Sequence, residues 1–542
     1  MVPSMSATVK DIVAVSEAQR AVQHGVVRAV GVIGAATLAS RVLGFVRDMV
    51  VARAFGAGPV TDAFFVAFRI PNLLRRLLAE GALSTAIIPV FTEYLERLGR
   101  AEFGRMVRAV TGVATVVLCV VSGLGMLLAP WIVRVMAPGW AADPELIGLA
   151  GRLTSLMFPY LLLVGLAALA MGALNAQHRF FTAAVGPAVL NVAMILSVLV
   201  LAGRMSPPVF SLAVGVLVGG AGQLLVQLPE LSRLGVPLRP SGEWSHPAVR
   251  MVAGRLWPAV FALAAVQVTV LVNTLLASLL PQGTVSYLYY ADRVMEFPLG
   301  VFGIALATAA LPSMAGQAAR GEHRALTDML GFSLRLSVFV ALPAAVGLVV
   351  LGHPIVRLLF ERGEFTASDA AATTQALAGY AVGLPAFSAT RIAAQTFYAL
   401  GDTRTPVWAG LVSVATNVVL ALVLMWPLQH AGLALASSLS AYVNLLLLCW
   451  LLRRRLGPIG GRQMAGSLLR TGGASAVLLL WCAWAGARLG AGWPGAAWTA
   501  GALAAGMLVY LGAAAALRAP ELGALLGMLR RRGQSLPGAG SG

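Results

Sequence analysis

The sequence predicts an all-α polytopic membrane protein. Of its 542 residues, 59% are hydrophobic and 11% are charged, whereas roughly 25% are charged in an ordinary soluble domain. Apolar stretches of roughly 20 residues, the length of a helix that spans a bilayer, recur along the whole chain. Arginines gather in alternate connections between these stretches, as expected on the cytoplasmic side of a membrane.

The first element is a polar segment, residues 1–26, which lacks the continuous apolar core of a signal peptide. We expect it to be a cytoplasmic extension. Fourteen candidate spans follow it. They are Val27–Ala54, Val60–Leu95, Met106–Leu128, Leu146–Leu174, Phe180–Ala202, Val209–Leu228, Val252–Leu280, Val285–Ser313, Leu326–Leu351, Ala371–Leu400, Pro406–Trp426, Ala431–Leu452, Leu468–Leu489 and Ala497–Ala516.

Loop charges fix the expected topology. The connections after the second, fourth, sixth, eighth, tenth and twelfth spans carry arginines, and so does the C-terminal tail with Arg530, Arg531 and Arg532. By the positive-inside rule both termini are cytoplasmic, which requires an even number of spans. The net charge of +18 follows from this topology and requires no nucleic-acid partner.

An internal repeat divides the chain. Ala82–Pro89 reads ALSTAIIP and Ala305–Pro312 reads ALATAALP, with five identities in eight at an interval of 223 residues, and the turn residues Ala176 and Ala399 lie at the same interval. We therefore expect two six-span halves of parallel topology, a transporter architecture with the substrate site between the halves. The predicted domains are the extension (1–26), an N-lobe (27–235), a C-lobe (236–457), spans thirteen and fourteen (458–518) and a cytoplasmic tail (519–542).

The first two spans carry unusually many ionisable residues. A charge at the bilayer centre costs about 2.5 to 3.5 kcal/mol on insertion scales, so such residues usually face a cavity. Helical spacing places Arg69, Asn72, Arg76 and Glu80 on one side, and Pro71 is expected to break that helix. The charged residues are Arg41, Arg47, Asp48, Arg69, Arg75, Arg76 and Glu80. They predict an aqueous cationic chamber; the alternative is that Arg76 and Glu80 form a structural pair and that Arg41 and Arg53 reach the membrane surfaces.

The eighth span, the repeat partner of the second, has the same character. Asp292 and Glu296 are four residues apart and share a helix face, with Arg293 about 100° away, just before Pro298. Both halves thus place charge beside a helix-breaking proline. If the halves face each other, these charged groups converge.

Ser40–Tyr94 and Tyr289–Ser313 resemble the signature segments of the MurJ (MviN) lipid II flippases of bacteria, within the MATE-like exporter superfamily. The resemblance implies two lobes that move the undecaprenyl-pyrophosphate-linked peptidoglycan precursor from the inner to the outer leaflet of the cytoplasmic membrane by alternating access. It also implies the cell-wall synthesis machinery as a further partner. Two extra spans after a twelve-span core also fit this family.

The resemblance further implies which residues bind substrate. The arginines that this family uses in its cavity fall on Arg41, Arg47, Arg75, Arg76 and Arg293, and the polar partners on Asp48, Asp62, Asn72, Glu80, Asp292 and Glu296. Some members use a sodium site on spans seven and eleven. Here those spans offer Gln267, Asn273 and Asn417 without a carboxylate, so the sequence predicts no metal or other cofactor.

The chemistry of the substrate agrees with arginine. A pyrophosphate carries about two negative charges and accepts paired guanidinium hydrogen bonds, which arginine provides better than lysine. The hypothesis is that Arg47 and Arg293 clamp the pyrophosphate while Asp48 and Glu296 hold those arginines. Arg41, Arg75 and Arg76 are expected to recruit the head group near the cytoplasmic mouth.

Several alternatives stay open from sequence. A flippase for another anionic lipid-linked oligosaccharide fits nearly as well, whereas an exporter of cationic drugs would need a carboxylate-rich cavity. No nucleophile motif, metal-spaced histidine cluster or phosphate loop indicates an enzyme. The tryptophan-rich segment Trp481–Trp498 predicts a membrane-interface anchor or, alternatively, part of a groove for the prenyl tail. The three cysteines are expected to be buried thiols.

Overall fold

The computed structural model describes residues 38–77, 87–236, 238–490 and 496–534. Helix makes up 88% of the structure, and no strand occurs in these ranges. The all-α prediction is confirmed. The N-terminal extension, Glu80 and the first repeat motif, Ala82–Pro89, lie wholly or mostly outside the described residues.

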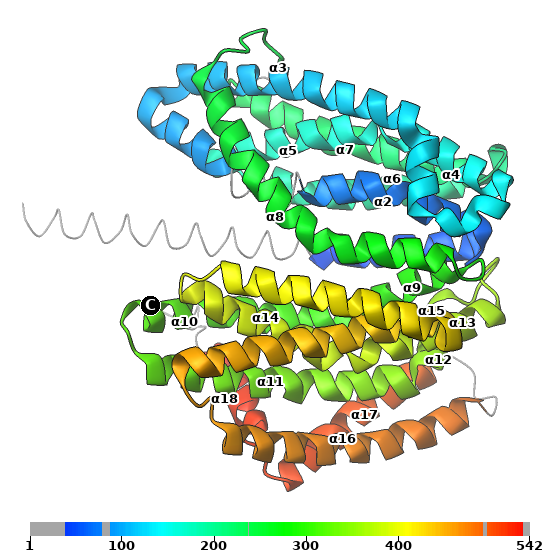
Figure 1. Ribbon diagram of the computed structural model, residues 1–542, viewed down its shortest axis with the longest axis vertical. Helices are drawn as coiled ribbons and strands as arrows, with labels where there is room; N and C mark the ends of the chain where they lie inside the picture. Colours follow the sequence, from blue (N-terminus) through cyan, green and yellow to red (C-terminus); the bar gives the residue numbers. More distant parts are fainter. Residues whose placement is uncertain (1–37, 78–86, 237, 491–495, 535–542) are drawn as a thin grey trace, which may run out of the picture. The chain divides into compact units, whose positions relative to one another are not determined.

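The helices follow one another with short connections (Figure 1). A first helix covers residues 38–55. The others are α2 (Pro59–Arg75), α3 (Ile88–Met136), η2 (Pro138–Ala142), α4 (Pro144–Met157), α5 (Tyr160–Ala176), α6 (Phe181–Leu201), η3 (Ala202–Arg204), α7 (Phe210–Arg233), α8 (Pro247–Ser278), α9 (Thr284–Pro298), the π-helical η4 (Leu299–Ile304), α10 (Ala305–Ala319), α11 (His323–Val350), α12 (Gly352–Phe360), α13 (Ala367–Val382), α14 (Leu384–Ala399), α15 (Arg404–Leu456), α16 (Gly461–Gly490), α17 (Ala496–Ala516) and α18 (Pro520–Gln534).

Eight helical stretches in the described ranges are long and apolar enough to cross a membrane. They are Ile88–Met136, Pro144–Ala176, Ala184–Arg204, Phe210–Arg233, His323–Val350, Arg404–Leu456, Gly461–Arg488 and Ala497–Ala516. The longest, α15, contains a non-helical residue, Gln429 (φ 48, ψ −128), between the two spans expected on its arms. The chain is a multi-pass membrane protein, while the count of fourteen spans and the side of the termini stay predictions.

The chain forms two compact units. The described parts of Met1–Ala54, Ala63–Arg134 and Asp143–Ala265 make up the first unit. The second unit contains Val266–Gly542 together with two short segments of the earlier chain, Phe55–Asp62 and Val135–Ala142.

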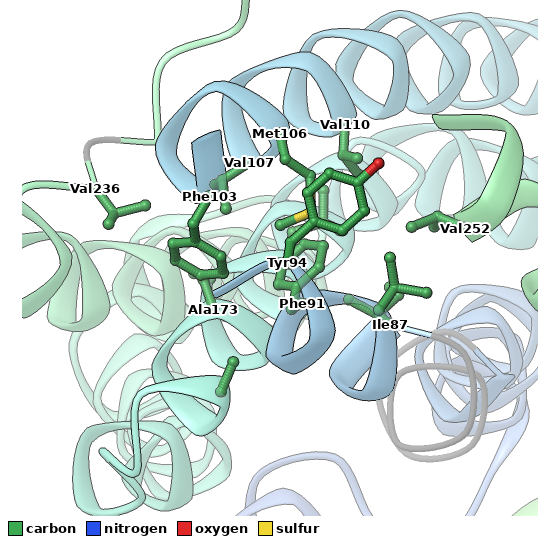
Figure 2. Packing of buried hydrophobic residues seen from close by; sticks show 14 of the residues in the cluster. Ile87, Phe91, Tyr94, Phe103, Met106, Val107, Val110, Ala173, Val236 and Val252 are labelled. Carbon is green, nitrogen blue, oxygen red and sulfur yellow. The ribbon is translucent and has the colours of Figure 1, made fainter. Parts of the chain in front are cut away.

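The first unit is organised around the bend of α3 at Gly99 (φ 78, ψ 178). The bend lets residues of the two arms of α3 pack together, and the rings of Phe91 and Phe103 meet edge to face with centroids 6.0 Å apart. Figure 2 shows these rings in one cluster with Met106 and with Ala173 of α5. Because these side chains are at most 5% exposed, the cluster fixes the angle between the two arms.

The second unit has two cores. In one, buried residues of α10, α11, α14 and α15 surround Phe397, which is 1% exposed. In the other, α16 and α17 pack on α11 (Figure 1). There the Tyr510 hydroxyl donates to the carbonyl of Phe339 at 2.6 Å, and their rings lie 5.3 Å apart. The last two long helices are therefore joined to α11 by apolar packing and a buried hydrogen bond.

The backbone repeats at the interval seen in the sequence. Left-handed residues that end helices or bend them occur in pairs 222 or 223 residues apart: Gly99 and Gly321 (φ 78 and 71), His178 and Gly401 (φ 59 and 74), and Gly235 and Gly457 (φ 73 and 89). A π-helical turn also begins at Arg76 and again at Leu299, 223 residues later. Helix ends and bends therefore occur at corresponding positions in the two halves of the sequence.

Two expectations need correction. Pro71 lies inside α2, which continues as α-helix to Arg75 and passes into a π-helical turn at Arg76, so the proline does not end the helix. A proline inside a helix removes one hydrogen bond without ending the helix when packing supports the rest. Of the three cysteines, which are all free, Cys119 is exposed. An apolar sequence around a cysteine is equally consistent with a side chain that faces lipid and with one that is buried in protein.

Candidate substrate-binding residues

Arg47 is the central residue of a polar cluster in the first unit. Its Nε and Nη2 donate to Oδ1 of Asp48 at 3.0 and 2.7 Å, and its Nη1 donates to Oδ1 of Asn191 at 3.0 Å. Arg47 is 9% exposed and Asp48 is 1% exposed. A charge buried to this degree requires a partner, and the adjacent carboxylate supplies it.

Asn191 of α6 completes this cluster. Its Nδ2 donates to the carbonyl of Ser40 at 3.1 Å, so the amide bridges the backbone of the first helix and the Arg47 guanidinium. Asn191 was not predicted as a site residue from the sequence. The signal that could have found it is an amide side chain inside the apolar run Gly186–Val200, where a polar group needs a partner.

The arginines of α2 lie in the same unit. Arg75 donates from Nε to Oδ1 of Asn72 at 3.2 Å, which agrees with their expected proximity. Arg75, Arg76 and Asn72 are half-buried, and Arg41 on the first helix is exposed. These four side chains are therefore more accessible than the buried Arg47.

Asp62 occupies a different environment. Its carboxylate accepts hydrogen bonds from the amides of Gly283 and Ser286 at 2.6 and 2.8 Å and from the Ser286 hydroxyl at 2.6 Å. The side chain is 1% exposed and lies within the second unit. It therefore caps the N-terminus of α9, where a carboxylate satisfies amides that have no helical partner and favours the helix dipole.

Arg293 is the central residue of a second polar cluster, on α9. Its Nη1 donates to Oε2 of Glu296 at 2.7 Å and its Nη2 to the Tyr289 hydroxyl at 3.1 Å. The side chains of Arg293 and Glu296 are 29% and 43% exposed. Asp292, on the same helix, is half-buried. This cluster is much more accessible than that of Arg47, and α9 ends directly after it at Pro298.

Both clusters share one chemical design. A guanidinium is paired with a carboxylate one or three residues away, so its position is fixed and its charge is partly balanced. Such an arginine presents a planar set of N–H donors that suits a phosphate, and the charge of the pair is lower than that of an isolated cation. The sequence analysis also did not single out Arg391, an exposed arginine on α14 within an apolar span.

Two of the residues suggested for a sodium site, Asn273 and Asn417, meet around one hydroxyl group. Asn273 of α8 and Asn417 of α15 both donate from Nδ2 to the Ser437 hydroxyl, at 3.1 and 3.2 Å, and that hydroxyl donates to the carbonyl of Leu433 at 3.1 Å. Sodium requires oxygen ligands, and here the amide nitrogens face the shared hydroxyl while Oδ1 of Asn273 and Oδ1 of Asn417 are buried with no hydrogen-bond partner among the described residues. No group of three or more His, Cys, Asp or Glu side chains suited to a metal ion occurs in the described ranges.

Comparison with known proteins decides the family. The model of the lipid II flippase MurJ family matches residues 51–495, which is most of the chain. The chain belongs to the MurJ family. A probable lipid II flippase MurJ of Vibrio cholerae is 38% identical over 424 residues, covering 77% of this chain and 81% of the relative. The lipid II flippase MurJ of Burkholderia cenocepacia is 38% identical over 476 residues, covering 85% and 92%.

Solved structures of the MurJ family and its neighbours share the fold. A lipid II flippase MurJ in an inward closed conformation superposes with a TM-score of 0.75 at 24% identity, covering 89% of this chain and 97% of that one. An inward-facing multidrug resistance MATE family transporter of the MOP superfamily follows with a TM-score of 0.62 at 13% identity. These likenesses show that the chain shares their fold.

Proposed function

We propose that this chain moves lipid II, the undecaprenyl-pyrophosphate-linked peptidoglycan precursor, from the inner to the outer leaflet of a bacterial cytoplasmic membrane. The observation that supports the proposal is the family match over residues 51–495, together with relatives named as lipid II flippases at 38% identity. The related proteins are transporters, and we propose no enzymatic step.

Within this function we assign pyrophosphate binding to Arg47 and Arg293. Each carries a guanidinium held by a carboxylate at 2.7 Å, which keeps the donors in place for a charged ligand. Two guanidinium groups match the two charged phosphates of the substrate. Asp48 and Glu296 act as their holders. We propose that Arg41, Arg75 and Arg76, which are exposed or half-buried, recruit the head group earlier in transport.

We further propose alternating access between two six-span halves, with both termini cytoplasmic and fourteen spans in all. The backbone repeat at intervals of 222 and 223 residues supports a duplicated architecture, and the names of related structures describe inward-facing and outward-facing states of MATE transporters. The cell-wall synthesis machinery is the proposed consumer of the translocated lipid.

The test is depletion and rescue. A bacterium is depleted of its own lipid II flippase, this chain is expressed, and growth is scored together with the amount of lipid II in the outer leaflet. Arg47→Ala and Arg293→Ala are expressed at equal abundance beside the wild type. Arg100→Ala, which changes an exposed arginine on α3, serves as the matched control for loss of an arginine.

We expect the wild type and Arg100→Ala to restore growth and outer-leaflet lipid II, and Arg47→Ala and Arg293→Ala to fail. Full activity of both Arg47→Ala and Arg293→Ala would overturn the assignment of pyrophosphate binding to these arginines. Failure of a correctly inserted wild type would overturn lipid II as the substrate and favour another anionic lipid-linked glycan.

A further inference from the structure

We propose that Asn191 is a positioning residue for Arg47, and that its neutral amide fixes the orientation of this guanidinium for the pyrophosphate without lowering its charge. This inference rests on the proposed function, in which Arg47 contacts the substrate. It concerns a residue of α6 that lies 144 positions from Arg47 in the sequence and carries no charge.

The hydrogen bonds around Asn191 determine which way its amide faces. Nδ2 donates to the carbonyl of Ser40 at 3.1 Å, which leaves Oδ1 to accept from Arg47 Nη1 at 3.0 Å. An asparagine can satisfy both partners at once because it carries a donor and an acceptor on one planar group. Asn191 is 6% exposed, so exchange of either bond for water would be costly.

Asp48 alone does not define the guanidinium plane as firmly. Its Oδ1 accepts from both Nε and Nη2, so a single oxygen atom serves one edge of the group. The bond from Nη1 to Asn191 adds a second, separate point of attachment. A bidentate contact with phosphate depends on the direction of two N–H groups in that plane. Asn191 therefore contributes to binding through the geometry of Arg47.

Neutrality of the side chain at position 191 is the second part of the inference. Arg47 is already paired with a buried carboxylate, and a further negative charge beside it would lower its net attraction for an anion. An aspartate at position 191 would keep the size and the acceptor of asparagine. It would also place a second negative charge 3.0 Å from the guanidinium and face the Ser40 carbonyl with an acceptor.

The experiment measures lipid II binding to the purified full chain in detergent by a direct titration. Asn191→Leu removes both hydrogen bonds and keeps the branched four-atom shape of the side chain, and Asn191→Asp retains both shape and size. Each is made in the wild-type chain and in an Arg47→Ala background. Ser197→Ala is the control, because Ser197 is a buried polar residue of the same helix that lies against Gly215 of α7. Thermal unfolding of every variant is recorded in parallel.

We expect Asn191→Leu to weaken lipid II binding by about tenfold, the lower end for a hydrogen bond to a charged group. Asn191→Asp should weaken binding at least as much although it preserves the shape, and Ser197→Ala should bind like the wild type. In the Arg47→Ala background both Asn191 substitutions should change affinity by less than about twofold, since residues that act through each other are not additive.

Three results would overturn the inference. If Arg47→Ala weakens binding while both Asn191 variants bind normally, Asn191 has no positioning role and the proposed function stands. If the Asn191 substitutions cost as much without Arg47 as with it, their effect is structural. If Arg47→Ala itself binds lipid II normally, the assigned role of Arg47 fails and the inference fails with it.

Discussion

At the scale of the residue, the pair of Arg47 and Asp48 is informative because both partners are buried. Removing two charges from water costs several kcal/mol for each ion, and their attraction offsets this cost only while both are present. The pair of Arg357 and Glu361 on the exposed side of α12 has equally short contacts, 2.6 Å for the closer one, but the Arg357 side chain is 54% exposed. Water screens this second pair, so its loss matters little.

We therefore predict that Asp48→Asn destabilises the protein by about 3 kcal/mol, because it removes the carboxylate that is paired with the buried Arg47 guanidinium. Glu361→Gln should cost less than about 1 kcal/mol. Equilibrium unfolding in detergent measures both. The double variant Asp48→Asn, Arg47→Gln should recover part of the loss, since no net charge then remains. Equal effects of Asp48→Asn and Glu361→Gln would contradict this account.

The sequence predicted the arginines of both clusters and their carboxylate partners, but it did not predict the neutral partner Asn191. Helical spacing and the cost of charge in lipid singled out Arg47, Asp48, Arg293 and Glu296, since that information is local. The contact to Asn191 was not predicted because it joins helices 144 residues apart. Asp62 was expected beside the arginines but caps α9. The pairing of helix faces depends on tertiary packing, and it cannot be predicted from one sequence alone.

At the scale of the element, bends at glycine shape the first unit. Gly99 adopts φ 78 and ψ 178, a backbone region essentially restricted to glycine, and a Cβ there would meet nothing within 4 Å. Any cost of a side chain at this position is therefore backbone strain alone. Gly104, five residues later in the same helix, is also free of steric contact but has an ordinary helical backbone.

This contrast gives a matched prediction. Gly99→Ala should destabilise the protein by roughly 1 to 3 kcal/mol through backbone strain, and should loosen the packing of Phe91 on Phe103 across the bend. Gly104→Ala should be neutral or stabilise by about 0.4 to 1 kcal/mol, because alanine restricts the unfolded chain. Thermal unfolding with tryptic digestion at the bend would test both. A loss for Gly104→Ala as large as that for Gly99→Ala would refute the strain argument.

At the scale of the whole molecule, composition and loop charge predicted the all-α membrane class, and the internal repeat reappears in the backbone at Gly99 and Gly321 and at His178 and Gly401. The position of the breaks was harder to predict. The π-helical turn at Leu299 directly follows Pro298, as the sequence predicted, whereas Pro71 leaves the α-helix around it intact and the other π-helical turn begins only at Arg76. Prolines are tolerated where neighbouring helices support the backbone, which the sequence of one helix does not reveal.

The neutral contact of Asn273, Asn417 and Ser437 leads to a prediction about the energy source of transport. Both amides direct their Nδ2 donors at one hydroxyl, so a cation at this centre would meet N–H groups while the amide oxygens face away from it. Replacing sodium by potassium at constant membrane potential should therefore leave the transport rate in proteoliposomes unchanged within about twofold, and should not shift thermal unfolding.

Asn417→Asp, which exchanges the Nδ2 donor for a charged oxygen, should make unfolding sensitive to sodium, because sodium prefers oxygen ligands and anionic ones most. A wild-type chain stabilised by sodium over potassium would show that the amides turn their oxygens inward to bind the ion.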